Sequence, residues 1–245
     1  MSHKYGLIPD APHVADRLYH LAVPRTTPLP PQVDLSRWLG PVLNQGPYGS
    51  CTAFAITGLR EWWMNFRHET FVPLSQAWLY DAERITEKTF PADDGAQIRD
   101  GMTILTTQGC APESLWPYTA QDLTTVPSAV ADQAAASYKF GVAHRVSGLS
   151  DILQALSHGR PVVLGLVLYP AFESPHVAQT GIVPMPQAGE QPLGGHATLC
   201  WGYDQSAQVL HVRNSWGAWG DQGSFTLPYV YAASHLLMDA WTLIP

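Results

Sequence analysis

The sequence predicts an α+β protein with two lobes and a cleft between them. After residue 32, apolar residues first recur at helical spacings of three and four. The later part of the chain contains apolar runs and alternations between turn residues, which is the pattern of strands. Helices that precede strands indicate separate helical and sheet layers. They argue against an α/β fold, in which strands and helices alternate along the chain. A cleft between two such lobes is a natural place for a site.

Residues 1–32 form an N-terminal extension that we expect to be extended or looped. The segment is rich in proline and ends in TTPLPPQ, and proline fixes φ and lacks a backbone donor. We expect residues 33–245 to form the body of the protein. Its helical lobe is expected over about 45–140 and its sheet lobe over about 141–245.

Five segments have the pattern of helices. The first is apolar nearly all round at its start, which indicates deep burial. Ser75 is a predicted N-cap, and Gly109 is expected to end the third helix. Ser150 and Gly159 are expected to bound a short helix that opens the second half. The predicted helices are 51–69, 73–88, 98–109, 128–138 and 150–160.

Five segments have the pattern of strands. The most apolar is PVVLGLVLYP, which is much shorter than the ~20 residues that a membrane span needs. We therefore expect a buried strand there and no association with a membrane. The predicted strands are 161–170, 196–204, 208–216, 223–229 and 239–244.

The composition limits the possible partners and compartments. Charged residues make up 13% of the chain and the formal net charge is −7, which disfavours nucleic acid as a partner. Three cysteines cannot form a complete disulfide framework, so a reducing compartment is the default. The N-terminus lacks a basic region followed by an apolar one. We expect a monomer that is cytoplasmic or exported without a classical signal peptide.

A lone cysteine, Cys51, stands at the start of the first predicted helix, in the stretch QGPYGSCTAFA. A helix N-terminus favours the thiolate, which makes Cys51 a candidate nucleophile. Gly49 and Ser50 have little bulk, so a substrate backbone could approach the thiol closely. The alternative is a small buried residue without chemistry.

A second and a third stretch carry candidate partners for this thiol. His196 follows a Gly-Gly pair in LGGHATLCWGYD, at the mouth of a predicted strand. Asn214 ends another strand in VRNSWGAWGDQGSF, and an Asn oxygen can fix the tautomer of a histidine. Trp216 could cover that bond. Alternatively, His196 is one satisfied histidine among ten, and Asn214 is a turn residue before core indoles.

Together the three stretches have the order and spacing of papain-type enzymes. His196 lies 145 residues after Cys51, and Asn214 lies 18 residues after His196. Gln45, six residues before the cysteine, could donate to an oxyanion. The chain resembles the papain family of cysteine peptidases from about Val33 to the C-terminus. The resemblance rests on PVLNQGPYGSCTAFA, PLSQAWLYDAERI, GAQIRDGMTILTTQGCAPESLWPY, GGHATLCWGYD and RNSWGAWGDQGSF.

The resemblance implies a papain-like two-lobe fold with a helical left lobe, an antiparallel β-barrel-like right lobe and the active-site cleft between them. It implies that Cys51 is the nucleophile, that His196 is the general base and acid, and that Asn214 orients the imidazole. The Gln45 side chain and the Cys51 backbone N–H would form the oxyanion hole. It implies substrate contacts at Gly49, Ser50, Asp94, Gly95, Gly195 and Trp216.

The chain departs from the family in ways that resemble bacterial-type members. Tyr48 stands where the family has a cysteine, so the usual local disulfide cannot form. Thr52 replaces an aromatic residue, and Gly195 replaces a polar residue before His196. These departures affect substrate preference and stabilising disulfides, not the catalytic set.

The function predicted on this basis is a thiol endopeptidase that acts on polypeptide and needs no cofactor. Amide hydrolysis or acyl transfer by the same triad is one alternative, and an inactive peptide-binding homologue is another. A zinc site at Cys51, Cys110, Cys200 and His196 matches no known spacing, so no metal is expected.

A separate prediction concerns where the N-terminal extension packs. Its stretch KYGLIPDAPHVADRLYHLAVP carries apolar side chains that need cover. We expect the extension to pack on the body and partly occlude the cleft. The alternative is a tether on the lobe surface, far from Cys51.

Overall fold

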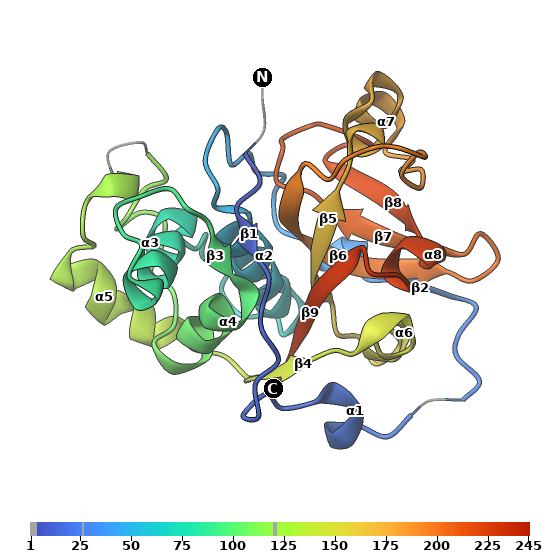
Figure 1. Ribbon diagram of the computed structural model, residues 1–245. Helices are drawn as coiled ribbons and strands as arrows, with labels where there is room; N and C mark the ends of the chain where they lie inside the picture. The colour runs from blue at the N-terminus through green and yellow to red at the C-terminus, as the bar shows by residue number, and fades with distance from the viewer. Residues whose placement is uncertain (1–3, 26, 120–121) are drawn as a thin grey trace.

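Helices gather on one side of the molecule, and an antiparallel sheet lies on the other side (Figure 1). This computed structural model describes residues 4–25, 27–119 and 122–245. Helices α2 to α5 precede the main strands along the chain, and the strands pair with each other. The predicted α+β class is therefore confirmed.

Helix α2 lies between the other helices and the sheet. It packs against strand β6 on one side and against α3 and α4 on the other. Its first seven residues are all buried, which explains why the sequence is apolar nearly all round at this point. The helices of this half are α2 (Cys51–Phe66), α3 (Gln76–Glu87), α4 (Ile98–Thr107) and α5 (Ala129–Ala135), with short 3-10 turns η2 (Asp122–Thr124) and η3 (Ala136–Tyr138).

The helix boundaries follow local capping chemistry. Ser75 is the N-cap of α3, and its hydroxyl accepts a backbone N–H three residues on, as predicted. The predicted N-cap at Ser150 is wrong, because α6 (Gly148–Ser157) begins earlier and has Ser147 as its N-cap. The Asp151 carboxylate accepts the Ser147 backbone N–H, so a first-turn acid satisfies the helix start. Gly159 follows the helix end with a φ of 69°, as expected.

The sheet is open, with β4 and β8 at its two edges. Its strands pair in the order β4-β9-β5-β6-β7-β8, all antiparallel, and β2 pairs with the far end of β6. Since β4 and β8 do not pair within the described residues, the expected barrel-like lobe is an open sheet and not a closed barrel. The strands are β2 (Gln32–Asp34), β4 (Val142–Arg145), β5 (Val162–Leu168), β6 (Gly194–Asp204), β7 (Val209–Arg213), β8 (Ser224–Pro228) and β9 (Leu237–Ile244).

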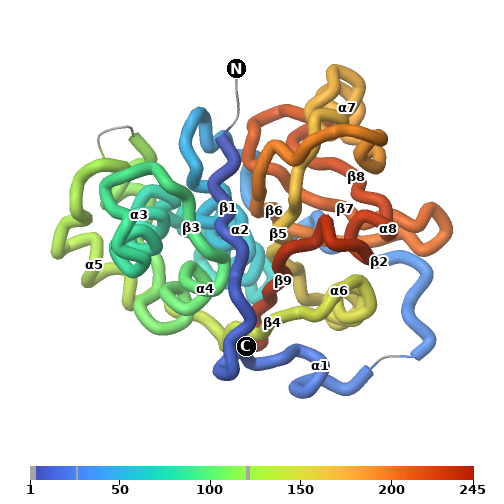
Figure 2. The backbone as a smooth tube through the Cα atoms, in the orientation of Figure 1, coloured from blue at the N-terminus to red at the C-terminus, as the bar shows by residue number. Residues whose placement is uncertain are grey.

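The start of the chain runs down the front of the molecule, between the helices and the sheet (Figure 2). Strand β1 (Leu7–Ile8) pairs in parallel with β3 (Ala96–Gln97), which precedes α4. Leu7 is 6% exposed and joins the hydrophobic cluster around α2. Tyr19, in the short helix α1 (Tyr19–Ala22), is 1% exposed and joins the cluster under the sheet. The extension is therefore an integral part of both hydrophobic clusters.

Short elements complete the sheet half. Turn η4 and helix α7 lie above β8 in Figure 1, and α8 follows β8. No helix within the described ranges has the length and apolar character needed to cross a bilayer. The bounds are η1 (Ser36–Trp38), η4 (Pro170–Glu173), α7 (Pro175–Thr180) and α8 (Tyr229–Ala232).

Candidate active site

Cys51 is the first residue of α2 and is completely buried. Its thiol lies against the backbone N–H groups of Ala197, in β6, and Gly6, in the N-terminal segment. Burial raises the pKa of the thiol to about 11, although these N–H groups lower it. A reactive thiolate was expected at this helix N-terminus. In this structure, burial of the thiol opposes the effect of the helix end, and reactivity of Cys51 stays a prediction.

His196 and Asn214 form a buried hydrogen-bonded pair. His196 lies near the start of β6, and Asn214 directly follows the neighbouring strand β7. The His196 Nε2 and Asn214 Oδ1 atoms are 2.8 Å apart. The same oxygen accepts the Ser215 backbone N–H at 2.8 Å, which identifies it as oxygen. The imidazole therefore donates from Nε2, and Nδ1 carries the lone pair of the neutral ring.

The indole of Trp216 covers this pair. Its ring stacks on the His196 ring with centroids 4.7 Å apart and an angle of 29° between the planes. Phe172 of η4 and Trp219 hold the indole edge-on from two other directions. Trp216 is 4% exposed, so it keeps water away from the imidazole, as predicted.

The packing of α2 on β6 brings the start of the helix, where Cys51 lies, close to the strand that carries His196. The thiol contacts the backbone of Ala197, the residue that directly follows His196 in the strand. Strand β6 is paired with β5 and β7 on its two sides, so its backbone is held in place. The fold therefore pairs His196 with Asn214 and packs the helix of Cys51 on the strand of His196.

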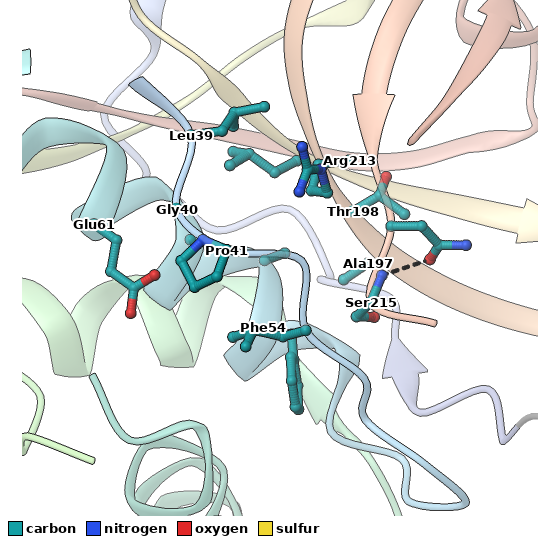
Figure 3. A pocket seen from close by; sticks show the side chains of 14 residues that line it. Leu39, Gly40, Pro41, Phe54, Glu61, Ala197, Thr198, Arg213 and Ser215 are labelled. Carbon is teal, nitrogen blue, oxygen red and sulfur yellow. Dashed lines mark hydrogen bonds between the residues drawn. The ribbon is translucent and has the colours of Figure 1, made fainter. Parts of the chain in front are cut away.

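Asn214 and its neighbour Ser215 help to line a cavity of about 40 Å³ (Figure 3). It is bounded by α2 on one side and by β6 and the end of β7 on the other, with Phe54, Ala197 and Ser215 in its wall. Its volume suits water and is too small for a peptide.

Gln45 is also completely buried and reaches the same place from the loop before α2. Its Nε2 donates to the backbone oxygen of Tyr48 at 2.7 Å and lies 3.4 Å from the backbone oxygen of Lys4. Its Oε1 accepts the hydroxyl of Ser215 at 2.6 Å. The amide N–H₂ group therefore faces the N-terminal segment.

Residues 4–8 lie beside the start of α2 and the segment around β3. The Ala96 N–H donates to the Gly6 oxygen at 2.8 Å, and the Gly6 N–H points at the Cys51 thiol. A Cβ added to Gly6 would lie 1.8 Å from the backbone oxygen of Gly49, so the two backbones are in close contact. The Lys4 ammonium pairs with the Asp93 carboxylate at 2.7 Å.

Three glycines predicted to contact substrate face this segment. Gly49 touches Gly6, as described above. A Cβ at Gly95 would lie 2.0 Å from the Gly6 oxygen, and Gly95 has a φ of 86°. A Cβ at Gly195 would lie 2.6 Å from the Leu7 oxygen. Each position lacks a side chain where another backbone passes, which is a physical reason for glycine there.

Two other predicted substrate contacts do not face the segment. The Ser50 hydroxyl is buried and shares a hydrogen bond with the Tyr118 hydroxyl at 2.6 Å. Asp94 is exposed, and its neighbour Asp93 instead accepts the Gly49 N–H at 3.0 Å and the Tyr80 hydroxyl at 2.6 Å. Adjacent residues of an extended chain point to opposite sides, so the pair Asp-Asp did not reveal which carboxylate faces the cleft.

Sequence reasoning missed Leu7, Ala96 and Ser215. Leu7 fills a pocket where a Cβ at Gly165 would lie 2.7 Å from the leucine methyl. Ala96 acts only through its backbone, so its side chain gave no indication. Ser215 stood next to a predicted catalytic residue, which was the one available clue.

The remaining thiols lie outside this site. Cys110 and Cys200 are fully buried in the two different hydrophobic clusters, and burial raises the pKa of the Cys200 thiol to about 12. Within the described part of the chain, no three His, Cys, Asp or Glu side chains gather in a way that could hold a metal ion.

The described site thus has a cysteine at a helix N-terminus and, on the strand that packs against this helix, a histidine hydrogen-bonded to an asparagine. The sequence profile described as "Papain family cysteine protease" matches residues 29–235. The chain belongs to the papain family of cysteine proteases.

Individual relatives agree with this assignment. The chain is similar to xylellain, a cysteine protease from Xylella fastidiosa, with a TM-score of 0.90 and 30% identity over 98% of this chain and 95% of that one. It is 35% identical to an uncharacterized peptidase C1-like protein of Acanthamoeba polyphaga mimivirus, over 82% of this chain and 68% of that protein. It is 27% identical to the thiol protease aleurain of Arabidopsis thaliana, over 77% of this chain. The match spans about half of the length of aleurain (52%).

Proposed function

We propose that this protein hydrolyses peptide bonds in extended polypeptide through a thioester on Cys51. The observation that carries the proposal is the placement of Cys51, at the start of α2, beside a strand whose His196 is hydrogen-bonded to Asn214. Membership of the papain family supports the same roles.

Acylation follows from this geometry. When the cleft opens, the thiol regains contact with water and transfers its proton to His196, which the helix N-terminus favours. The thiolate then attacks the carbonyl carbon, and the C–S bond forms. The Gln45 amide and the Cys51 N–H stabilise the developing oxyanion. The C–N bond breaks, and the departing amine takes the proton from His196.

Deacylation uses the same groups in the reverse roles. His196 accepts a proton from water, whose oxygen attacks the thioester carbon. The C–S bond breaks, the acid product leaves and the thiol is restored. Asn214 is a positioning residue, because it holds the ring with Nε2 as donor throughout.

One observation favours polypeptide over a small amide as the substrate. The backbone edge at Ala96 pairs with an extended chain, here the protein's own residues 7–8. An edge of this kind recognises backbone rather than one small group. If the same groups transfer the acyl group to an amine, product analysis in the presence of an added amine will show the new amide. If the protein only binds peptide, no acyl product will form.

The N-terminal segment is proposed to occlude the cleft of the resting enzyme. It pairs in parallel with β3, and the Gly6 backbone lies close to the thiol of Cys51. Because it lies where an extended substrate would pair with β3, the segment acts as a tethered competitor of substrate. Burial of Cys51, His196 and Gln45 beneath it supports this role.

Substitutions at the proposed catalytic pair test the function. Cys51→Ala and His196→Ala are expected to abolish hydrolysis of a fluorogenic peptide, and Cys51→Ala also to abolish labelling by an epoxysuccinyl peptide. His158→Ala is a matched control, because His158 bonds to the Tyr19 hydroxyl at 2.8 Å at the end of α6. Full hydrolysis by Cys51→Ala would disprove the proposal.

A further inference from the structure

The carboxylate of Asp93 has two oxygens with different kinds of partner. Oδ1 accepts the Gly49 N–H at 3.0 Å and the Tyr80 hydroxyl at 2.6 Å. The Tyr80 oxygen in turn accepts the Gly95 N–H at 3.0 Å, so the body of the protein fixes this side of the carboxylate. Oδ2 instead accepts the Lys4 ammonium at 2.7 Å, and Lys4 belongs to the N-terminal segment.

Lys4 is the only cation that pairs with this carboxylate among the residues that the structure describes. Arg84 donates to the backbone oxygen of Ala92, directly before Asp93, but its guanidinium pairs with the buried Asp81. When the N-terminal segment leaves, as proposed above, Asp93 therefore keeps its charge and its orientation but loses its cation. The side chain of Asp93 is 28% exposed even with Lys4 in place, so a cation can reach it from solvent. An anionic group held in this way attracts another positively charged side chain.

Lys4 also shows from which position of a bound chain such a side chain comes. Its backbone oxygen lies 3.4 Å from Nε2 of Gln45, the amide proposed to stabilise the oxyanion. Its ammonium donates to Oδ2 of Asp93 and also to the backbone oxygen of the same residue. One residue therefore places its carbonyl at the Gln45 amide and its positive charge on Asp93 at the same time. In a bound substrate, the carbonyl at this amide is the one that Cys51 attacks.

We propose that Asp93 selects substrates in which the residue that supplies the scissile carbonyl is lysine or arginine. The inference rests on the proposed function and deepens it, because it names the polypeptides that are cut: those with a basic residue on the amino side of the scissile bond. Either side chain is long enough to span the distance that Lys4 spans, and the fork of arginine can engage Oδ2 and the Asp93 backbone oxygen together. The net charge of −7 acts in the same direction, because it favours the approach of positively charged peptides.

The test compares two fluorogenic peptides that differ at one side chain. The residue before the scissile bond is arginine in one peptide and citrulline, which has nearly the same shape and no charge, in the other. Both are given to the same full-length protein, so the ratio of their kcat/KM values does not depend on how often the N-terminal segment leaves the cleft. The ratio is expected to be about five- to tenfold in favour of arginine, the order for a partly exposed ion pair that also makes hydrogen bonds. In about 1 M salt most of this preference is expected to disappear, because the Debye length falls to about 3 Å.

Asp93→Asn removes the charge and keeps the fixed contacts. An amide oxygen in place of Oδ1 still accepts the Gly49 N–H and the Tyr80 hydroxyl. Arginine is then expected to have no advantage over citrulline. Asp94→Asn is a matched control, because it removes the same charge from the exposed neighbour, which is not the carboxylate that Lys4 pairs with, and it is expected to keep the preference. Lys4→Gln removes the competing cation, so it is expected to raise kcat/KM for both peptides by the same factor and to keep their ratio.

The outcomes separate the inference from the function on which it rests. Hydrolysis of both peptides with equal efficiency, or an arginine preference that Asp93→Asn retains, overturns the inference and leaves the proposed function intact. Hydrolysis of neither peptide, even by Lys4→Gln, contradicts the proposed function and the inference with it. If Asp93→Asn melts too low to assay, the salt dependence of the wild-type protein decides instead. An arginine preference that persists in about 1 M salt then contradicts selection by the charge of Asp93.

Discussion

Substitution of Gly6 by alanine is expected to move the N-terminal segment out of the cleft. An added Cβ would lie 1.8 Å from the oxygen, 2.3 Å from the carbonyl carbon and 2.5 Å from the Cα of Gly49. These are backbone atoms, and the Gly49 N–H is itself held by Asp93. The clash therefore cannot be relieved by rotation of a side chain, and one of the two backbones must shift.

The size of the effect follows from the cost of inserting one methyl group into a packed contact. Overpacking of this kind costs typically about 1–3 kcal/mol, which corresponds to a rise of roughly 5- to 150-fold in the ratio of open to closed protein. The open state alone exposes Cys51, so the rate of its alkylation is expected to rise by the same factor. In the open state the thiol also loses the burial that raises its pKa to about 11.

The assay is alkylation by iodoacetamide in large excess, followed by peptide mapping of the three cysteines. Cys110 and Cys200 are internal controls, because both are completely buried in the hydrophobic clusters and react only when the protein unfolds. Val14→Ala is the matched control in the same segment, since Val14 is 99% exposed. An unchanged rate at Cys51 would refute the occlusion, and equal labelling of all three thiols would indicate unfolding instead.

Three further predictions concern turnover, pH and truncation. Gln45→Ala is expected to lower kcat by about 10²–10³ without changing alkylation of Cys51, and equal turnover would contradict the oxyanion role. Burial raises the pKa of Glu61 to about 7, so this carboxyl favours the folded state at low pH, and its contribution is lost as the pH rises from about 4.5 to 7. Glu61→Gln is therefore expected to raise the melting temperature at pH 8 more than at pH 5; equal shifts would show that the carboxyl does not titrate in this range. Removal of residues 1–9 is expected to activate hydrolysis but also removes the buried Leu7, and removal of residues 1–28 removes the buried Tyr19 as well; differential scanning calorimetry is expected to show a lower melting temperature for both, with the larger drop for 1–28.

The helices and strands could be predicted because their causes are local. The strand at Val162–Leu168 was visible as a continuous apolar run, and it lies between two other strands with nearly every residue buried. The start of α3 followed from Ser75. The start of α6 was missed because two serines, Ser147 and Ser150, both fit the pattern of an N-cap. Only the contact between Ser147 and Asp151 distinguishes them.

The state of Cys51 could not be predicted from its neighbours in the chain. A helix N-terminus lowers the pKa of a thiol, and that local argument predicted a thiolate. The structure adds Gly6 above the sulfur and β6 beside it, and the loss of water around the thiol reverses the direction of the shift. Desolvation depends on every segment that packs on the group, including one 45 residues earlier in the chain.

The sequence by itself determined the class of fold and the family, and it singled out Cys51, His196, Asn214 and Gln45 as candidates, because residue type, order and spacing are written in the chain. Tertiary structure alone decided that Asp93 and not Asp94 faces the cleft, and that Ser215 holds Gln45. It also decided that residues 7–8 pair with β3 in the parallel direction. The direction of strand pairing, the side to which a side chain points and its access to solvent all depend on contacts between distant segments. Only the folded chain brings those segments together.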